Sequence, residues 1–483
     1  MRGGAHSTEA ASTTGSESTP APADHPRPAY AWFVVGVLVL ASLVSYIDRQ
    51  IVAIVVAPLK ADLHASDSEI GWLYGVFALF FAVAGMPIAM LADRYSRTRL
   101  IATGVFIWSA LTAVCGLASS FVQVLLARIG VGVGEAVLTP AATSLIADCF
   151  PRPKIPFAIS VFMVGSTLGS GLAFVVGGFV LGLVQGAGRA HVPLLGDLGA
   201  WQQVFLVCGL PGLLLVPFVL LVREPQRRYL TAKSSGGASL SEILAFYRAN
   251  RTTLLLHHLG FLCFSLMGFG FVFWSITFFA RVHGMQASTA AQIFGWLQLV
   301  FASLGSVWAP MLAARLARDG RRDGNIVAGM VGGGLAMVSI ILIQPMPTAF
   351  WAWVLYVPAL FFVSSPFGLA YGSLPVITPA PMRAVVTAGF MLVVNLGMLL
   401  GPPIAGALNE RIFPGPQGVR WSLLTLTPIV GLTGLTLLAF GRRHYGASLE
   451  AADRLEAAER GQAAQRLDAA AANAAGALAT KSS

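Results

Sequence analysis

Long, uninterrupted apolar stretches constrain this chain more than any other feature, because they recur along nearly its whole length. A helix that crosses a bilayer needs about 20 consecutive, mostly apolar residues. Twelve segments are long and apolar enough, at about 30–58, 69–92, 100–119, 121–147, 156–184, 201–222, 253–280, 289–314, 325–344, 348–372, 383–409 and 418–440. We therefore expect an all-α membrane protein with twelve transmembrane helices.

The composition agrees with a membrane protein, since 56% of the residues are hydrophobic and only 11% are charged. A soluble domain carries roughly 25% charged residues. A net charge of +10 would suggest nucleic-acid binding in a soluble protein. Here the basic residues lie in short loops, so no nucleic-acid partner is expected. The Cys residues have neither metal-site nor disulfide-framework spacing, and we expect them to pack within the bundle: Cys115, Cys149, Cys208 and Cys263.

The loops alternate between strongly basic and weakly basic along the chain. The weakly basic set contains only Lys60, Arg189, Arg281, Arg411 and Arg420. Loops rich in Lys and Arg stay on the cytoplasmic side of a membrane. The pattern therefore predicts an integral membrane protein with both termini in the cytoplasm, and we expect it in a bacterial inner (plasma) membrane.

The chain divides into two halves around its longest internal connection. We expect a disordered cytoplasmic tail at 1–28, a six-helix half at 29–222, a cytoplasmic loop at 223–252, a second six-helix half at 253–440 and a cytoplasmic tail at 441–483, helical or disordered. The fifth and eleventh spans carry matching runs of glycine, which indicates an internal repeat. Two pseudo-symmetric six-helix halves are typical of secondary transporters.

Four charged residues lie deep inside the apolar spans: Asp48 and Arg49 in the first, and Arg128 and Glu135 in the fourth. A charge at the centre of a membrane helix costs about 2.5–3.5 kcal/mol on insertion scales, so such residues are usually functional. Arg128 and Glu135 share one helical face, about 10 Å apart. Counting inward from the span ends places Arg128 about seven residues deep and Glu135 about fourteen, with Asp48 between these depths, so the first and fourth spans could bring the four charges together.

This pattern leads to a hypothesis about coupling. With both acids ionised the four charges cancel, and a proton on either acid leaves one guanidinium free to hold an anionic substrate group. We expect Asp48 and Glu135 to form a proton-coupling pair, with Arg49 and Arg128 as charge partners or anion ligands. The alternative is that these charges only fix the packing of the helices.

Residues 89–97, A-M-L-A-D-R-Y-S-R, resemble the G-x-x-x-D-R-x-G-R-R signature of the major facilitator superfamily, with Ala89 and Ser96 in place of glycines. Within that superfamily, the runs Y-I-D-R at 46–49, S-D-S-E-I-G at 66–71 and R-I-G-V-G-V-G-E at 128–135 resemble the Spinster-like group. The resemblance implies a central cavity between the halves, alternating access, and a cytoplasmic gate formed by Asp93, Arg94 and Arg97. Simple topogenic charge is the alternative for those three.

The resemblance also implies a substrate class without fixing it. Spinster-like proteins are linked to transport of lysophospholipids and sphingosine phosphate, whereas bacterial relatives are often labelled as organic-anion carriers. Trp274, Tyr371 and Asn395 combine bulk with a polar group, so they are weaker candidates for lining the cavity. Packing or an interfacial position is the alternative for each of them.

Other classes of function fit less well. The sequence has no G-x-x-x-x-G-K-[ST] loop for ATP and no H-E-x-x-H run, so neither an ATP-driven pump nor an enzyme is expected. A transporter-like receptor or scaffold stays open. We expect a monomer that binds a small molecule or lysolipid among membrane lipids, with no cofactor or metal and with protons as the coupling ion. Import and export are both compatible with the sequence.

Overall fold

The structure, a computed structural model, describes residues 26–188, 190–192, 196–225 and 239–479. Almost all of the tail expected at 1–28 and the middle of the loop expected at 223–252 lie outside the described residues. Within the described part, twelve helical stretches are long and apolar enough to cross a membrane. The expected all-α membrane fold is confirmed.

The N-terminal half contains the first six spans. They are formed by α1 (Pro28–Ile54), α3 (Asp67–Arg94), α4 (Arg97–Cys115), α5 (Phe121–Glu135) with α6 (Leu138–Cys149), α7 (Ile155–Ala187) and α8 (Ala200–Leu220). Short elements join them: α2 (Val56–Leu63), η1 (Arg152–Lys154), β1 (Ala190–Val192) and β2 (Gly196–Leu198). The two strands pair antiparallel, with His191 opposite Asp197.

The C-terminal half contains the other six spans. They are formed by α10 (Arg251–His283), α11 (Ala287–Leu297) with the π-helical turn η2 (Gln298–Ala302) and α12 (Ser303–Arg318), α13 (Gly324–Ile343), α14 (Ala349–Ile377), η3 (Ala380–Met382) with α15 (Arg383–Arg411), and α16 (Gly418–Ala479). An additional helix, α9 (Leu240–Ala249), precedes α10 within the expected central loop.

The first span differs from the single helix expected over 30–58. The structure ends α1 at Ile54 and starts α2 at Val56. Pro58 explains the break, because a proline ring clashes with the carbonyl four residues earlier, which here belongs to Ile54. The last span differs in the other direction, since α16 runs without interruption beyond 440 to Ala479.

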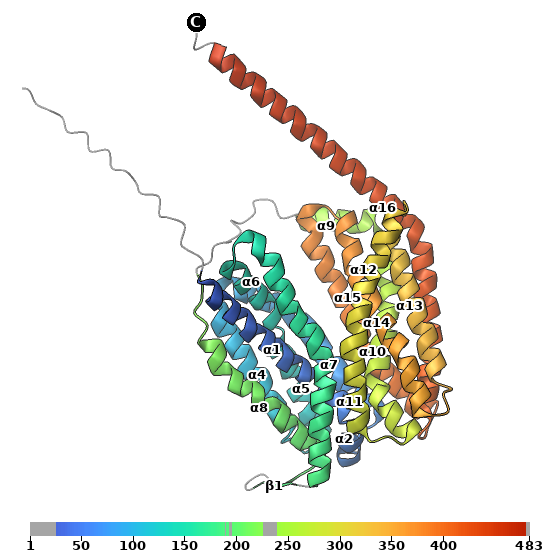
Figure 1. Cartoon of the computed structure of the whole chain (residues 1–483). Coiled ribbons are helices and arrows are strands. Elements are labelled where there is room, and N and C mark those ends of the chain that lie inside the picture. The colour runs from blue at the N-terminus through green and yellow to red at the C-terminus, as the bar shows by residue number, and fades with distance from the viewer. Residues whose placement is uncertain (1–25, 189, 193–195, 226–238, 480–483) are drawn as a thin grey trace, which may run out of the picture.

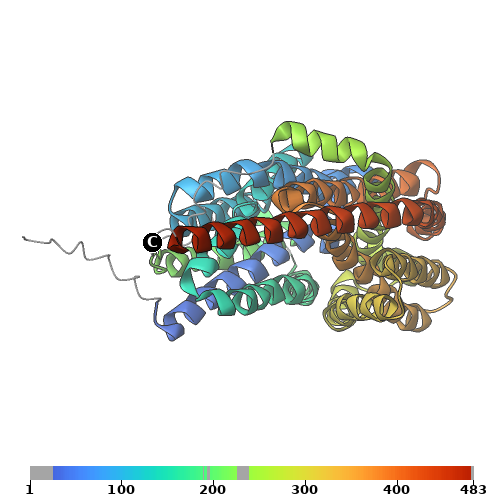
Figure 2. The same ribbon diagram turned by 90° about the horizontal axis from the view of Figure 1, so that it is seen from above.

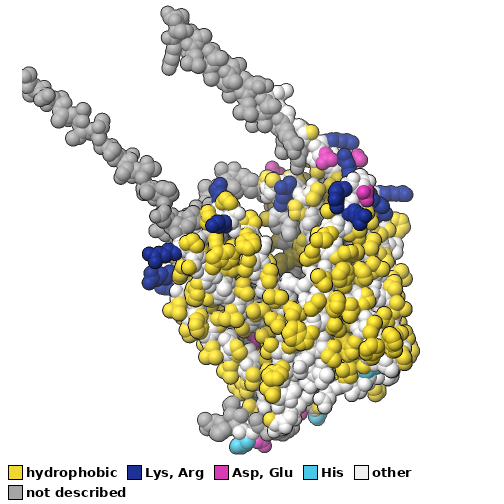
Figure 3. All heavy atoms as spheres, viewed as in Figure 1, with side chains coloured by type: hydrophobic (Ala, Val, Ile, Leu, Met, Phe, Trp, Pro, Cys, Tyr) yellow, Lys and Arg dark blue, Asp and Glu magenta, His cyan; other side chains and the backbone are white. Residues whose placement is uncertain are grey.

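The two halves stand side by side and diverge toward one end (Figure 1). We call the end where α1 begins and α16 leaves the bundle the tail end, and the end that carries β1 and β2 the hairpin end. Seen from above, the extension of α16 passes over the N-terminal half (Figure 2). A band of hydrophobic side chains covers the outer surface, and a hollow separates the halves toward the tail end (Figure 3).

The halves meet closely at the hairpin end because glycines let the helix backbones approach. A Cβ on Gly71 of α3 would lie 2.6 Å from the backbone nitrogen of Pro403 in α15. A Cβ on Gly178 of α7 would lie 2.8 Å from the Cβ of Ala291 in α11. The matching glycine runs of the fifth and eleventh spans thus lie in α7 and α15. Each of these two helices packs against a helix of the opposite half.

The same helices separate toward the tail end. Along α3 the side chains of Leu73, Phe77 and Ala78 are fully buried, whereas Val83 and Met86 are 60% and 63% exposed. Along α15 Met398 and Ala405 are buried, whereas Leu392 is 46% exposed. The molecule is therefore closed at the hairpin end and open at the tail end.

Candidate functional site

Two of the intramembrane charges form an ion pair between α1 and α5. Arg49 Nε donates to Glu135 Oε2 at 2.7 Å, and Ser45 Oγ donates to the same oxygen at 2.7 Å. The side chain of Glu135 is fully buried, while that of Arg49 is 17% exposed. The guanidinium is therefore the accessible member of the pair.

The other two charges face each other less directly. Arg128 Nη1 donates to the backbone carbonyl of Asp48 at 2.9 Å, not to its carboxylate. Both carboxylate oxygens of Asp48 are buried, and neither accepts a hydrogen bond of normal geometry from the described residues. A buried carboxylate without a partner is unfavourable unless it is protonated or hydrated. Asp48 is thus the group in this cluster whose charge is least compensated.

Aromatic rings of α3 and α1 surround the partly accessible guanidinium of Arg49. The Cζ of Arg49 lies 4.4 Å from the ring centroid of Phe81 and 4.9 Å from that of Tyr46. Phe77 stands between the two arginines, 5.4 Å from Arg49 and 4.9 Å from Arg128. Cations within about 6 Å of an aromatic face are attracted by its quadrupole. The site therefore combines positive charge with apolar walls.

These rings were not predicted from the sequence. Phe77 and Phe81 are four residues apart and so share one face of α3, but a Phe pair at that spacing is ordinary in a membrane helix. A Cβ on Gly132 of α5 would lie 2.7 Å from the carbonyl oxygen of Phe77, so this glycine allows the close approach. That contact between distant segments brings the rings to the arginines.

The gate residues expected from the resemblance lie at the tail end. Arg97 is buried and pairs with Asp148 at 2.5 Å and with Glu224 at 2.7 Å. Arg94 is exposed, and the side chain of Asp93 lies outside the described residues. The other partners of Arg97 are Ser144 and the carbonyl of Pro225. Within the described residues Arg97 therefore contacts only the N-terminal half and the segment that follows α8, and it does not join the halves.

Glu224 ties this cluster together just after α8. It accepts from the backbone N–H of Thr98 at 2.9 Å and from Ser96 Oγ at 3.0 Å. Burial raises the pKa of Glu224, but the hydrogen bonds from Thr98 and Arg97 outweigh it, so the pKa lies below its usual value. The carboxylate is therefore held in its charged form.

A related cluster occupies the tail end of the C-terminal half. Asp323, just before α13, accepts from Arg442 of α16 at 2.6 Å and pairs with Arg321 at 3.4 Å. Burial raises the pKa of Asp323, but the contacts with these arginines outweigh it and lower the pKa. The second half thus has an acidic centre between arginines, which its sequence pattern did not reveal.

The weaker cavity candidates occupy different environments. Trp274 is fully buried, and its Nε1 donates to the carbonyl of Pro402 at 3.0 Å. Tyr371 is partly buried against Phe390, with ring centroids 5.0 Å apart. Asn395 is partly buried, and its side-chain amide donates to the carbonyl of Met391 in its own helix at 2.8 Å. In this conformation Tyr371 and Asn395 are partly accessible, whereas Trp274 is not.

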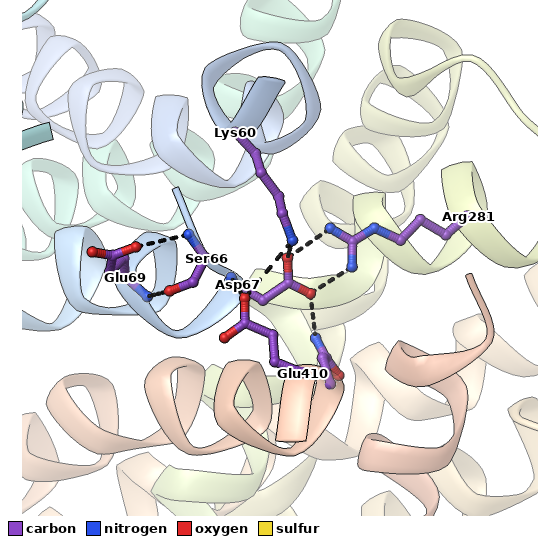
Figure 4. Close-up of polar contacts among 7 residues, drawn as sticks. Lys60, Ser66, Asp67, Glu69, Arg281 and Glu410 are labelled. Atoms are coloured by element: carbon purple, nitrogen blue, oxygen red, sulfur yellow. Dashed lines mark hydrogen bonds and ion pairs between the residues drawn. The ribbon is translucent and has the colours of Figure 1, made fainter. Parts of the chain in front are cut away.

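A further polar cluster, also missed by the sequence analysis, joins the halves at the hairpin end (Figure 4). Asp67, the first residue of α3, receives Arg281 of α10 through both carboxylate oxygens, at 2.5 and 2.8 Å. Lys60 lies 2.5 Å from Asp67 Oδ1, and Asn409 of α15 donates to Oδ2 at 3.2 Å. Glu410 accepts from the Asp67 backbone N–H. We call these five residues the Asp67 cluster.

Local sequence explains why Asp67 is held so firmly. Ser66 caps α3, since its Oγ accepts from the Glu69 N–H at 3.1 Å while its own N–H donates to the Glu69 carboxylate at 2.8 Å. This S-x-x-E capping box fixes the start of the helix and hence the Asp67 side chain. Among the described residues, no group of three His, Cys, Asp or Glu side chains is arranged to hold a metal ion.

Comparison with known proteins agrees with this architecture. Residues 38–380 match the family model of the Major Facilitator Superfamily. An MFS-type efflux pump of Mycolicibacterium smegmatis is 27% identical over 426 residues, covering 85% of this chain and 92% of the pump. The sphingosine-1-phosphate transporter of Danio rerio is 31% identical over 199 residues, which are 40% of this chain and 36% of that protein.

The fold is also similar to that of a solved bacterial homologue of the human lysosomal transporter Spinster, in an inward-facing and unoccupied conformation. That structure superposes with a TM-score of 0.73 at 26% identity, covering 88% of this chain and 98% of the other. The twelve spans and the family match define an integral membrane transport protein. The chain belongs to the major facilitator superfamily, and its resemblance to the Spinster-like group is confirmed.

Proposed function

We propose that this chain is a proton-coupled secondary active transporter that moves an amphiphilic anion, of the lysophospholipid or sphingolipid type, by alternating access. Transport rather than catalysis is the activity that the family and the fold support. The observation that carries the proposal is the Arg49–Glu135 pair beside Asp48, whose buried carboxylate has no hydrogen-bond partner of normal geometry among the described residues.

In this mechanism the ionised Glu135 carboxylate and the anionic substrate compete for Arg49, and a proton on Glu135 favours the substrate. When Glu135 is ionised it neutralises Arg49 across 2.7 Å. When Glu135 is protonated, the guanidinium keeps its full charge and is free to bind an anionic group. Asp48 lies next to Arg49 in α1. A proton that moves from Asp48 to Glu135 therefore leaves the Arg49 guanidinium without its ion-pair partner and available to the substrate.

The walls of the site favour an amphiphile. The rings of Tyr46 and Phe81 flank the Arg49 guanidinium, so a phosphate bound to it would have apolar surface on either side. One relative is named as a transporter of sphingosine-1-phosphate, which has this chemistry. A small carboxylate or sugar acid, carried with a proton, is the second candidate, since Arg49 and Arg128 alone would suffice for it.

By the positive-inside rule we place the tail end in the cytoplasm, because the basic loops lie there. Arg94, Arg152, Arg223 and Arg318 are examples. The structure then corresponds to an inward-open state of a protein with both termini in the cytoplasm, in a bacterial inner membrane. We expect a monomer that uses no cofactor other than the transported protons.

The test has two stages. Purified protein is first screened by thermal shift against lysolipids and small organic anions at two pH values. The stabilising compound is then used to measure substrate-dependent proton movement into liposomes that contain wild type, Asp48→Asn, Glu135→Gln or the surface control Asp197→Asn. We expect the first two variants to lose proton-coupled transport and the control to keep it.

Full pH-driven transport by both Asp48→Asn and Glu135→Gln would overturn the coupling mechanism. Stabilisation by a ligand without any proton or substrate flux in wild type would instead favour a transporter-like receptor or scaffold.

A further inference from the structure

An apolar groove lies between α1 and α8 on the outer surface of the N-terminal half. It has a volume of about 460 Å³, within the roughly 300–1,000 Å³ range of small-molecule sites. Its lining is entirely apolar and includes Phe33, Gly36 and Leu40 of α1 and Leu214 and Phe218 of α8. The groove is separate from Arg49 and from the hollow between the halves.

The rim of the groove is exposed while its floor is buried. Leu40 and Leu214 are 49% and 70% exposed, whereas Val44 and Leu215 are 7% and 3% exposed. A Cβ on Gly36 would meet no atom within 4 Å. The glycine therefore leaves the groove open where any larger residue would begin to fill it.

The length of the groove matches one leaflet. Along α1 it extends from Phe33 to Val44, a span of about 16 Å at 1.5 Å per residue. The hydrocarbon core of a bilayer is about 30 Å thick. The groove therefore follows the depth of the leaflet at the tail end, in the direction that an acyl chain takes.

Positive charge stands at the mouth of the groove. Arg27 directly precedes α1, and Arg223 follows α8; both residues are exposed. The backbone N–H of Arg223 donates to the hydroxyl of Tyr30 at 2.6 Å. The ring centroid of Tyr30 lies 6.2 Å from that of Phe33, which lines the groove. These contacts hold the start of α1 and the segment after α8, which carry the two arginines, close together at the tail end of the groove.

We infer that this groove binds one acyl chain of an anionic phospholipid from the tail-end leaflet, with the lipid phosphate at Arg27 and Arg223. The charge commits the site to an anionic headgroup, because guanidinium groups near a membrane surface attract anionic lipids. The bound lipid is a resident of the N-terminal half, distinct from the transported substrate.

The experiment uses the full-length protein in detergent with equimolar phosphatidylglycerol and phosphatidylethanolamine of identical acyl chains, read by native mass spectrometry. Wild type should retain phosphatidylglycerol in preference. Gly36→Leu should lose this adduct, while Gly186→Leu, at another glycine with no atom within 4 Å of a Cβ, should keep it.

A second pair of variants tests the headgroup. Arg27→Gln combined with Arg223→Gln should lower the phosphatidylglycerol preference by roughly five- to 25-fold, since each basic residue contributes about a factor of five. Arg315→Gln with Arg318→Gln, an exposed pair at the tail end of the other half, should leave it unchanged.

Three results would overturn the inference: equal retention of both lipids by wild type, an undiminished adduct in Gly36→Leu, or an unchanged preference in the Arg27 and Arg223 double variant. If Gly36→Leu does not fold, Leu40→Trp fills the groove from its exposed rim and must show the same loss.

Discussion

Arg281 of α10 donates two parallel hydrogen bonds to the carboxylate of Asp67 in α3, and this bidentate pair joins the two halves at the closed hairpin end. The Asp67 side chain is only 2% exposed, against 24% for Arg281. Bidentate pairs are among the stronger and more directional polar contacts in proteins. The Asp67 cluster therefore holds the halves together at the hairpin end, and we call it the latch.

Removing the charge of Asp67 should loosen the closed end. Asp67→Asn leaves Arg281 and Lys60 facing each other with weaker acceptors. We expect distances between spin labels at Val122→Cys and Phe350→Cys to broaden toward longer values. Asp197→Asn, which affects only the exposed pair with His191 in the hairpin, is the matched control. Identical distance distributions in Asp67→Asn and wild type would show that the latch does not hold the halves.

Enlarging a glycine at the interface between the halves should destabilise this state. A Cβ on Gly178 would lie 2.8 Å from both the Ala291 Cβ and the Ser288 carbonyl oxygen. Overpacking of this kind costs about 1–3 kcal/mol, so Gly178→Ala should lower the unfolding temperature in detergent. Gly186→Ala, where the space is free, should not. A Gly178→Ala protein as stable as wild type would mean that α7 and α11 separate readily.

Removing the ring of Phe81 should weaken ligand binding. Its centroid lies 4.4 Å from the Arg49 guanidinium, and such contacts contribute about 0.5–2 kcal/mol. Phe81→Leu keeps the apolar volume but removes the ring that positions the Arg49 guanidinium, so the affinity for the ligand found by thermal shift should fall, by at most about 30-fold. Phe106→Leu, at an exposed position of α4, is the control. Unchanged affinity in titration calorimetry would remove Phe81 from the site.

The tail-end cluster around Glu224 should lose stability in acid. The pKa of Glu224 is lowered in the folded state, whereas in the unfolded chain it lies near 4.3. Its contribution is therefore fully present above the unfolded pKa and is lost as the pH falls through the folded value. Glu224→Gln should unfold at a lower temperature than wild type at pH 7, and the difference should shrink below pH 4. A difference that is constant with pH would exclude the charge as its cause.

The sequence allowed the spans to be predicted because lipid imposes length and apolarity on each helix separately. Counting residues inward from the span ends also placed Asp48 between the depths of Arg128 and Glu135. In the structure Arg49 contacts Glu135, and Arg128 donates to the Asp48 carbonyl. The pairing of Arg49 with Glu135 did not follow, because depth along a helix says nothing about rotation around it.

The Asp67 cluster could not be predicted for a different reason. Asp67 and Arg281 are 214 residues apart, and Asp67 and Asn409 are 342 apart. Each residue lies near a helix end, where charged and polar side chains are ordinary, so no local signal marks it. The break after α1 was within reach of the sequence, since the ring of Pro58 clashes with the carbonyl of Ile54 and so interrupts a continuous helix there.

The helix α3 begins at Asp67 and carries Phe77 and Phe81 further along its length. Its first residue pairs with Arg281 of the opposite half, and its middle supplies the rings that face Arg49. A change in the tilt of α3 therefore moves Asp67 and the two Phe rings together. By reciprocity of linked equilibria, a ligand that favours one position of the rings shifts the latch by the same free energy with which the latch shifts the ligand.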